Sequence, residues 1–183
     1  MDDIVKAAMA KWPNVPHCYG WLALDARGTW RMRDERCQAM NLAGDPIRHS
    51  SLLGFINRNY QHDDQGQWYF QNGPQRVYVD LETTPYIART SDCGFTLHNN
   101  EAMPLPEHVY LDASGHLILQ SKAMLAQLDD RDLAECLSLL YTGDAIVSDE
   151  QLLAWMNRQA PTLQLTLQLP GNDHLRIPVQ HAE

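Results

Sequence analysis

Apolar and polar residues alternate with strict regularity near the end of the chain. In one segment every second residue is leucine, at Leu163, Leu165, Leu167 and Leu169, and Thr or Gln lies between them. After the turn sequence Pro-Gly-Asn-Asp the alternation resumes at Leu175, Ile177 and Val179. Because a period of two places such residues on one face of a strand, the pattern predicts a β-hairpin over residues 163–179 with one apolar face.

A spacing of three and four residues between apolar side chains predicts helices in four places. They are expected over residues 2–11, 46–60, 130–141 and 148–158. Asp45 or Ser50 is the expected N-cap of the second helix. The fourth helix begins with Ser148 and Gln151 at the spacing of a capping box, in which each side chain hydrogen-bonds the other residue's backbone.

A turn of the form Asp-x-x-Gly recurs between apolar strand residues. Residues 25–28 join the predicted strands 21–24 and 29–33, residues 112–115 join 109–111 and 116–119, and a partial third copy starts at Asp63. Asp at the first position and Gly at the fourth suit a tight turn, because glycine adopts a positive φ at little cost. The recurrence in both halves indicates a duplicated α+β unit, although the motif also arises independently wherever this turn is needed.

The formal charges divide the chain near residue 90. Residues 1–89 carry ten Lys and Arg and ten Asp and Glu, whereas residues 90–183 carry four bases and thirteen acids. The first part also contains three predicted strands of an antiparallel sheet, over residues 62–70, 76–80 and 86–89. We predict an α+β protein of two related units, residues 1–90 and 91–183, each an antiparallel sheet with a packed helix. The cleft between such units is the expected ligand site.

Composition excludes several classes of partner and location. The formal net charge of −9 argues against a general nucleic-acid binder, because Lys and Arg on phosphate supply that affinity. No run approaches the roughly 18 apolar residues of a membrane span, and the start of the chain lacks the features of a secretory signal. The cysteines are too far apart for a metal knuckle or a redox motif, at Cys18, Cys37, Cys93 and Cys136. We expect a soluble, cytoplasmic protein with reduced thiols and neither a membrane nor a nucleic-acid partner.

Signatures of the common enzyme classes are missing from the sequence. It contains no G-x-S-x-G elbow, no G-x-x-x-x-G-K-[ST] phosphate loop and no G-x-G-x-x-G. His17 and Cys18 are adjacent, so on a strand they point to opposite faces. Cys93 and His98 do not have the spacing of metal ligands. The sequence therefore predicts no metal, no cofactor and no catalytic residue, and favours a non-enzymatic role over an enzyme with an unfamiliar site.

An anion site is the functional hypothesis with positive support. Eight of the eleven arginines fall between Arg27 and Arg89, and guanidinium groups bind carboxylate or phosphate through paired N–H donors. Arg31 and Arg33 share one face of a strand. The expected ligand-binding residues, around an anionic small molecule, are Arg31, Arg33, Arg48, Arg58, Arg76, Tyr78, Tyr86 and Arg89, with a tyrosine stacking on the ligand. The alternative is that these arginines pair with surface acids, at Asp34, Glu35, Asp80 and Glu82.

Several motifs of residues 20–90 together resemble a known group of families. They are Gly28-Thr29-Trp30, Pro46-Ile47, a helix with Leu53 and Phe55, Asp63-x-x-Gly66-x-Trp68, Val77-Tyr78-Val79-Asp80 and Pro85-Tyr86-Ile87-Ala88. The order of these motifs is similar to a group of uncharacterised proteobacterial families of domains of unknown function. The resemblance covers a little under half of the chain and includes no catalytic motif, and the second half departs from the pattern.

This resemblance implies a fold and a role. It implies a duplicated α+β core whose C-terminal half is loosely like a pleckstrin-homology fold. It also implies a nucleotide-like ligand between the two halves and a function in signal transduction. The leading expectation is a small-ligand-binding or sensor protein. The alternative is a protein-interaction adaptor, forming homodimers or binding another protein through an exposed apolar edge of the hairpin over residues 163–179.

Overall fold

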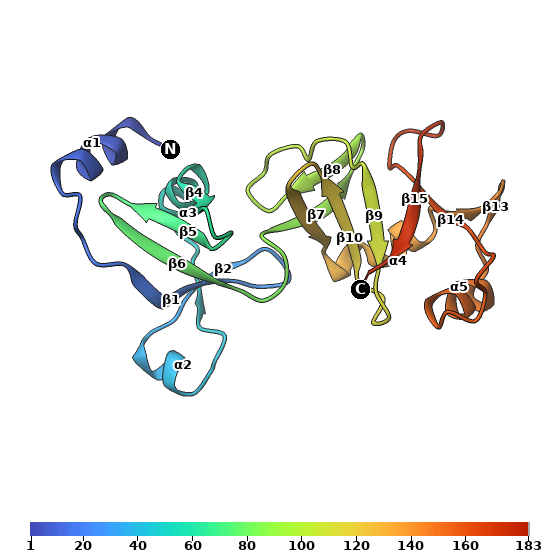
Figure 1. The fold of residues 1–183 in the computed structure, drawn as a ribbon, viewed down its shortest axis with the longest axis horizontal. Coiled ribbons are helices and arrows are strands. Elements are labelled where there is room, and N and C mark those ends of the chain that lie inside the picture. The colour runs from blue at the N-terminus through green and yellow to red at the C-terminus, as the bar shows by residue number, and fades with distance from the viewer. Residues whose placement is uncertain (183) are drawn as a thin grey trace. The chain divides into compact units, whose positions relative to one another are not determined.

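The computed structural model describes residues 1–182, which form two compact units, Met1–Pro85 and a second from Tyr86 onward (Figure 1). Both units combine a sheet with short helices, so the predicted α+β class is confirmed. Within residues 1–182, no helix combines the length and the apolar character that crossing a bilayer requires.

The first unit is built on a six-stranded sheet with the strand order β3-β2-β1-β6-β5-β4. The strands are β1 (Cys18–Leu24), β2 (Trp30–Met32), β3 (Asp45–Pro46), β4 (Tyr60–His62), β5 (Trp68–Asn72) and β6 (Gln75–Leu81). The helices are α1 (Asp3–Lys11), α2 (Glu35–Ala39) and α3 (Ser50–Arg58). Helix α3 packs on one face of the sheet, where the core consists of Leu22, Leu24, Trp30, Ile56, Phe70 and Val77.

The N-cap of α3 differs from both predicted residues. Ser50 is the first helical residue and Asp45 lies in β3. His49 is the cap instead, and its Nδ1 accepts a hydrogen bond of 3.4 Å from the backbone N–H of Leu52. Histidine is an unusual N-cap, so the known preference for Ser and Asp at this position points to Ser50 and Asp45 instead of His49.

Strand direction also departs from the prediction, because both sheets are mixed. β1 pairs with β6 in parallel, with Leu22 opposite Val79 and Leu24 opposite Leu81. The connection between them is long enough for a crossover, which parallel pairing requires. The alternation of apolar residues fixes which face a side chain occupies and leaves the direction of the partner strand open.

The second unit contains a nine-stranded sheet with the order β13-β12-β14-β15-β9-β10-β11-β7-β8. Its strands are β7 (Tyr86–Ser91), β8 (Gly94–Leu97), β9 (His108–Leu111), β10 (Leu117–Ser121), β11 (Met124–Leu128), β12 (Leu140–Thr142), β13 (Ala145–Ile146), β14 (Leu165–Gln168) and β15 (Arg176–His181). The helices are the 3-10 turn η1 (Asp130–Asp132), α4 (Leu133–Leu137) and α5 (Asp149–Met156). The predicted capping box of α5, between Ser148 and Gln151, is confirmed.

Two predicted elements of this region form, one with a different sheet partner and the other with a different end. The strand over residues 86–89 was expected in the sheet of the first unit, but β7 pairs with β11 and β8 in the second. The helix over 130–141 ends at Leu137, and Leu140 begins strand β12, where it lies opposite Leu167. In both cases a short apolar segment satisfies more than one pattern, and the partner that buries it decides.

The C-terminal hairpin forms as predicted, with Leu165 opposite Val179 and Leu167 opposite Ile177. Its apolar face is buried, since Leu165 and Leu167 are 2% and 0% exposed. Both edges are also covered, because β14 pairs with β12 and β15 pairs with β9. The expectation that this hairpin offers an exposed apolar edge for self-association is therefore wrong.

The three Asp-x-x-Gly turns share one hydrogen-bond pattern. In each, one carboxylate oxygen of the aspartate accepts from the backbone N–H groups two and four residues later. The glycines have φ values of 76°, 77° and 88°, at Gly28, Gly66 and Gly115. The second carboxylate oxygen takes a different partner each time: Arg31 for Asp25, Tyr78 for Asp63 and His116 for Asp112. The turn therefore has a local cause in each copy, and the duplication stays a prediction.

Asp132 connects η1 to β7 by four hydrogen bonds. It accepts from Arg89 Nε and Nη2 at 3.1 and 2.7 Å, and from the backbone N–H and the hydroxyl of Thr90 at 2.9 and 3.1 Å. The hydrogen bonds from the Arg89 guanidinium favour the ionised carboxylate and hold the pKa of Asp132 below its usual value.

The variant Asp132→Ala should lower the free energy of unfolding by about 2 kcal/mol, because a buried acceptor of a charged donor is lost while Arg89, half exposed, regains water. Urea unfolding at neutral pH measures this difference. Asp144→Ala is the control, because Asp144 is fully exposed and should change stability by less than about 0.5 kcal/mol. Equal losses in the two variants would contradict the assignment.

Candidate functional site

A hollow of about 380 Å³ lies on the face of the first sheet that is opposite α3. Three strands form its floor, since Arg31 on β2 and Asp80 on β6 both lie opposite Ala23 on β1. These side chains alternate with the core residues Leu22 and Leu24, so they point away from the core. The small side chain of Ala23, between Arg31 and Asp80, leaves the space.

One wall of the hollow is the loop of residues 41–44, which we call the wall loop. The two arginines hold it, because Arg31 Nη1 donates to the carbonyl of Gly44 at 3.1 Å and Arg33 Nε donates to the carbonyl of Leu42 at 3.1 Å. Gly44 has a φ of 84°, and a Cβ there would lie 2.3 Å from the carbonyl oxygen of Met32. Glycine therefore allows the loop to pass this close to β2.

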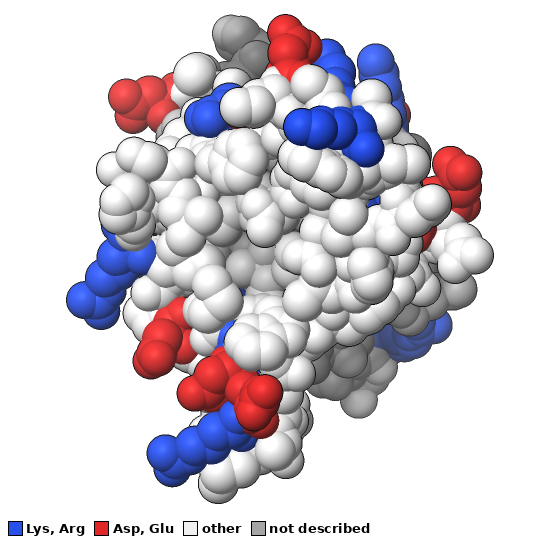
Figure 2. Space-filling model, turned by 90° about the vertical axis from the view of Figure 1, so that its left-hand side faces the viewer, with Lys and Arg blue, Asp and Glu red and all other residues white. Residues whose placement is uncertain are grey.

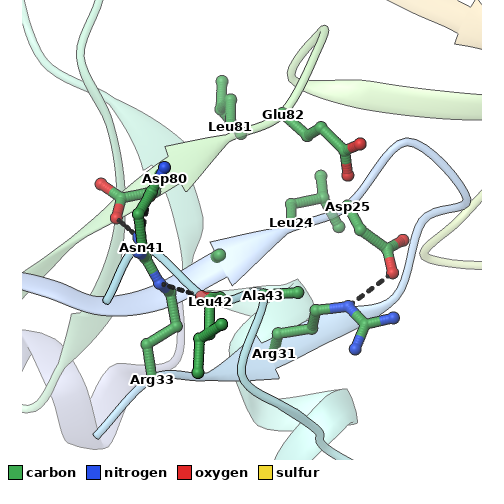
Figure 3. A pocket seen from close by; sticks show the side chains of 11 residues that line it. Leu24, Asp25, Arg31, Arg33, Asn41, Leu42, Ala43, Asp80, Leu81 and Glu82 are labelled. Atoms are coloured by element: carbon green, nitrogen blue, oxygen red, sulfur yellow. Dashed lines mark hydrogen bonds and ion pairs between the residues drawn. The ribbon is translucent and has the colours of Figure 1, made fainter. Parts of the chain in front are cut away.

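Both arginines of the hollow are paired with carboxylates (Figure 3). Arg31 Nε lies 2.7 Å from Asp25 Oδ2, and Arg33 Nη1 donates to Asp80. A third acid, Glu82, accepts a hydrogen bond of 2.9 Å from the backbone N–H of Ala26. Figure 3 shows Arg31 with Asp25 at one end, Arg33 with Asp80 at the other, and Leu24 and Ala43 between them.

The other arginines that were predicted on the first unit lie outside the hollow. Arg58 is exposed and its Nε lies 3.2 Å from Asp2 Oδ1. The guanidinium of Arg76 lies over the ring of Tyr69, 4.5 Å from its centroid. Arg48 is exposed just before α3. Arg58 and Arg76 thus have partners of their own, and the lining of the hollow includes none of the three.

Tyr78 is also removed from the hollow. It is only 9% exposed, its hydroxyl donates to Asp63 at 3.0 Å, and its ring stacks on Tyr19 at 4.7 Å with an interplanar angle of 2°. The carboxylate of Asp63 accepts a hydrogen bond from the backbone N–H of Gln67, and this bond contributes most to holding the pKa of Asp63 below its usual value. The ring of Tyr78 is therefore covered by Tyr19.

The last two predicted residues belong to the second unit. Tyr86 lies in β7 with its ring 5.9 Å from that of His98, and burial raises its pKa. Arg89 binds Asp132 as described. Of the eight predicted site residues, the structure thus brings Arg31 and Arg33 together at the hollow. The pairing with surface acids that was the alternative occurs for Arg33 with Asp80.

Sequence reasoning missed three parts of the hollow: Asp25, Ala23 and the wall loop. Asp25 was assigned to its turn, although its second carboxylate oxygen also orients Arg31. Ala23 was detectable as the small residue between Leu22 and Leu24 in an alternating strand. The wall loop carries no pattern, because its position depends on the pairing of β2 with β3.

Charge is distributed without a continuous basic patch on the face drawn in Figure 2. The Lys and Arg side chains stand apart from one another, with Asp and Glu among them and an uncharged area between. Within residues 1–182, no three His, Cys, Asp or Glu side chains are placed to hold a metal ion.

A second hollow of about 530 Å³ lies in the second unit, between β7 and the turn that begins at Pro170. Its lining includes the acids Asp92 and Glu135 and no base among the described residues. Gly171 has a φ of 69° and a Cβ there would lie 1.9 Å from the carbonyl oxygen of Asp92. Glycine at this position therefore allows the turn to pass close to the backbone of Asp92, beside the hollow.

Comparison with known proteins identifies the family. The DUF2944 family model, described as "Protein of unknown function (DUF2946)", matches residues 1–174. The chain belongs to the DUF2944 family. The expectation of a family of unknown function is therefore confirmed. None of the curated proteins matches this DUF2944 chain.

Solved structures similar to this DUF2944 family member come from another family of unknown function. One is the crystal structure of a DUF1285 family protein from Silicibacter pomeroyi DSS-3, 13% identical over 90% of this chain and 82% of that chain, with a TM-score of 0.54. Another is a DUF1285 family protein from Shewanella baltica OS155, 10% identical over 63% of this chain and 88% of that chain, with a TM-score of 0.45. At this identity the first likeness concerns the fold alone.

Proposed function

We propose that the protein binds a small molecule in the hollow of the first unit, without catalysing a reaction, and that Arg31 holds an acidic group of the ligand. The observation that carries this proposal is the fixed orientation of Arg31. Its Nε and Nη1 are bonded to Asp25 and to Gly44, and within residues 1–182 its Nη2 has no hydrogen-bond acceptor. A guanidinium held in this way presents its remaining donors to a carboxylate or phosphate with little loss of entropy.

Arg33 has a different role from Arg31, although the two were predicted together. Its three nitrogens donate to Leu42, Asp80 and Asn41, and its side chain is 12% exposed. Each of the three guanidinium nitrogens of Arg33 therefore already donates a hydrogen bond within the protein. Arg33 positions the wall loop, and Arg31 is the residue that is available to a ligand.

The size and composition of the hollow suit a small ligand. About 380 Å³ falls in the range of roughly 300–1,000 Å³ typical of ligand pockets, which combine apolar walls with a few polar groups. The described residues that line it include no Ser, Thr, Cys, His or Lys, and two of its three carboxylates, those of Asp25 and Asp80, are already paired with arginines, which leaves few groups for nucleophilic or acid-base chemistry. Binding is thus better supported than catalysis. A sensor role in signal transduction, as the resemblance implies, is part of the proposal.

Thermal unfolding with millimolar succinate, L-glutamate, inorganic phosphate or AMP tests the proposal. A ligand at about 100 times its Kd adds roughly 2.7 kcal/mol, which raises the Tm of a chain of this length by several degrees. We expect at least one of these acidic probes to do so. A flat response to all four would overturn the proposal.

Two variants locate the site. Arg31→Gln removes a charged donor that contributes about 1.5–3 kcal/mol, so affinity for the active probe should fall at least tenfold. Ala23→Leu fills the floor of the hollow without changing a charge, and should also abolish the shift. Arg48→Gln is the matched control, because Arg48 lies outside the hollow, and it should bind as the unmodified protein does. A shift that survives both Arg31→Gln and Ala23→Leu places the ligand elsewhere.

A further inference from the structure

We infer that the ligand of the hollow is a zwitterion of the amino-acid type, with its acidic group on Arg31, its protonated amine on Glu82 and an apolar side chain between the polar ends. The inference rests on the proposed function and adds the chemical class of the ligand. It follows from the balance of charges in the hollow and from the position of Glu82.

The lining carries more acid than base. Arg31 and Arg33 face three carboxylates, those of Asp25, Asp80 and Glu82. Asp25 and Asp80 are each paired with an arginine, whereas within residues 1–182 the carboxylate of Glu82 is bonded only to the backbone N–H of Ala26. A ligand that is only anionic would add to an excess of negative charge, and Coulomb repulsion would oppose it. A ligand that also carries an ammonium group supplies the cation that Glu82 lacks.

Glu82 and Arg31 are within reach of one small molecule. Both lie beside Asp25: Arg31 bonds its carboxylate, while the backbone N–H of Glu82 donates to the carbonyl of Leu24 at 3.1 Å. Arg31 lies on β2 and Glu82 directly follows β6, and these two strands flank β1, so the two backbones are at least two strand spacings apart, about 10 Å. Both long side chains line the hollow and reach toward it from the two sides of β1, so one small zwitterion would bridge the remaining span.

The Glu82 carboxylate is held in place before a ligand arrives. Its Oε2 accepts from the Ala26 N–H at 2.9 Å, in the turn whose geometry Asp25 fixes. Its Oε1 has no hydrogen-bond donor among residues 1–182. The apolar part of the lining that the wall loop supplies, Leu42 and Ala43, would contact the side chain of the ligand.

Three matched compounds test the inference by calorimetry. L-Leucine carries both charged groups, 4-methylpentanoate lacks the amine, and 3-methylbutan-1-amine lacks the carboxylate. We expect L-leucine to bind at least tenfold more tightly than either analogue. If 4-methylpentanoate binds as well as L-leucine, the zwitterion is wrong and the proposed acid-binding function stands. If an acidic probe binds through Arg31 while L-leucine does not bind, the inference fails in the same way. If none of the four acidic probes shifts the Tm, the proposed function itself fails, and this inference fails with it.

Glu82→Gln tests the residue that is assigned to the amine. Glutamine keeps an oxygen for the Ala26 N–H and loses the charge, so the turn should persist. The preference for L-leucine over 4-methylpentanoate should fall from at least tenfold to near unity. Glu35→Gln is the control, since Glu35 is an exposed acid outside the hollow, and it should keep the preference. An unchanged preference in Glu82→Gln would overturn the assignment.

Discussion

Alanine in place of Leu167 should lower the free energy of unfolding by about 3 kcal/mol, because a fully buried leucine loses its apolar contacts and leaves a cavity. Leu167 is 0% exposed and lies in β14, which is paired on both sides, with β12 and β15. Strands in this position relax little around a missing side chain, so the cavity should remain. Denaturant unfolding followed by circular dichroism measures the loss.

Leu153→Ala is the matched control for this substitution. Leu153 lies on α5 and is 57% exposed, so the same change in chemistry should alter stability by less than about 0.5 kcal/mol. If Leu167→Ala were equally mild, the apolar face of the hairpin would not be buried in the core. The hypothesis of an exposed hairpin edge would then regain support.

Lowering the pH from about 6.5 to 4 should weaken the second unit through His98. Burial lowers the pKa of this imidazole to about 4, and its Nδ1 accepts a hydrogen bond of 3.3 Å from the backbone N–H of Ile87. The unfolded chain takes up a proton near pH 6.5, whereas the folded chain takes it up only near pH 4. The free energy of unfolding is therefore highest above pH 6.5, and up to about 3 kcal/mol is lost as the pH falls through this window.

His98→Gln isolates this contribution. Glutamine does not titrate and retains an acceptor for the Ile87 N–H, so the variant should lose much less stability between pH 7 and pH 4.5. Urea unfolding at several pH values gives the comparison. Carboxyls with lowered pKa, such as Asp129 and Asp132, act at more acidic pH, because their stabilisation is lost only as the pH falls below their usual range. Parallel pH profiles for the two proteins would show that His98 is not the cause.

The candidate site shows how far local reasoning reaches. That Arg31 and Arg33 share a face follows from strand alternation, and the structure places both at the hollow. Their different roles do not follow from it. Arg33 is enclosed by the wall loop and Asp80, while Arg31 keeps donors available. The distinction depends on Asp80, which is 47 residues from Arg33 along the chain.

The tyrosines show the same limit. Tyr78 was proposed to stack on a ligand, but Tyr19 already covers its ring. The two tyrosines become neighbours only because β1 and β6 pair in parallel, with an irregularity between Cys18 and Leu22. Alternation within each strand contains no information about that register.

The sequence by itself determined the α+β class, the C-terminal hairpin, the capping box at Ser148 and the Asp-x-x-Gly turns. These features depend on neighbours within a few residues, where backbone geometry and hydrogen-bonding side chains act directly. Only the tertiary structure decided that β7 belongs to the second sheet, that β1 and β6 run in parallel, and that Arg31, Asp25 and Glu82 meet at one hollow. Such choices depend on which distant surfaces are buried together, and similar apolar strands compete for each of those places.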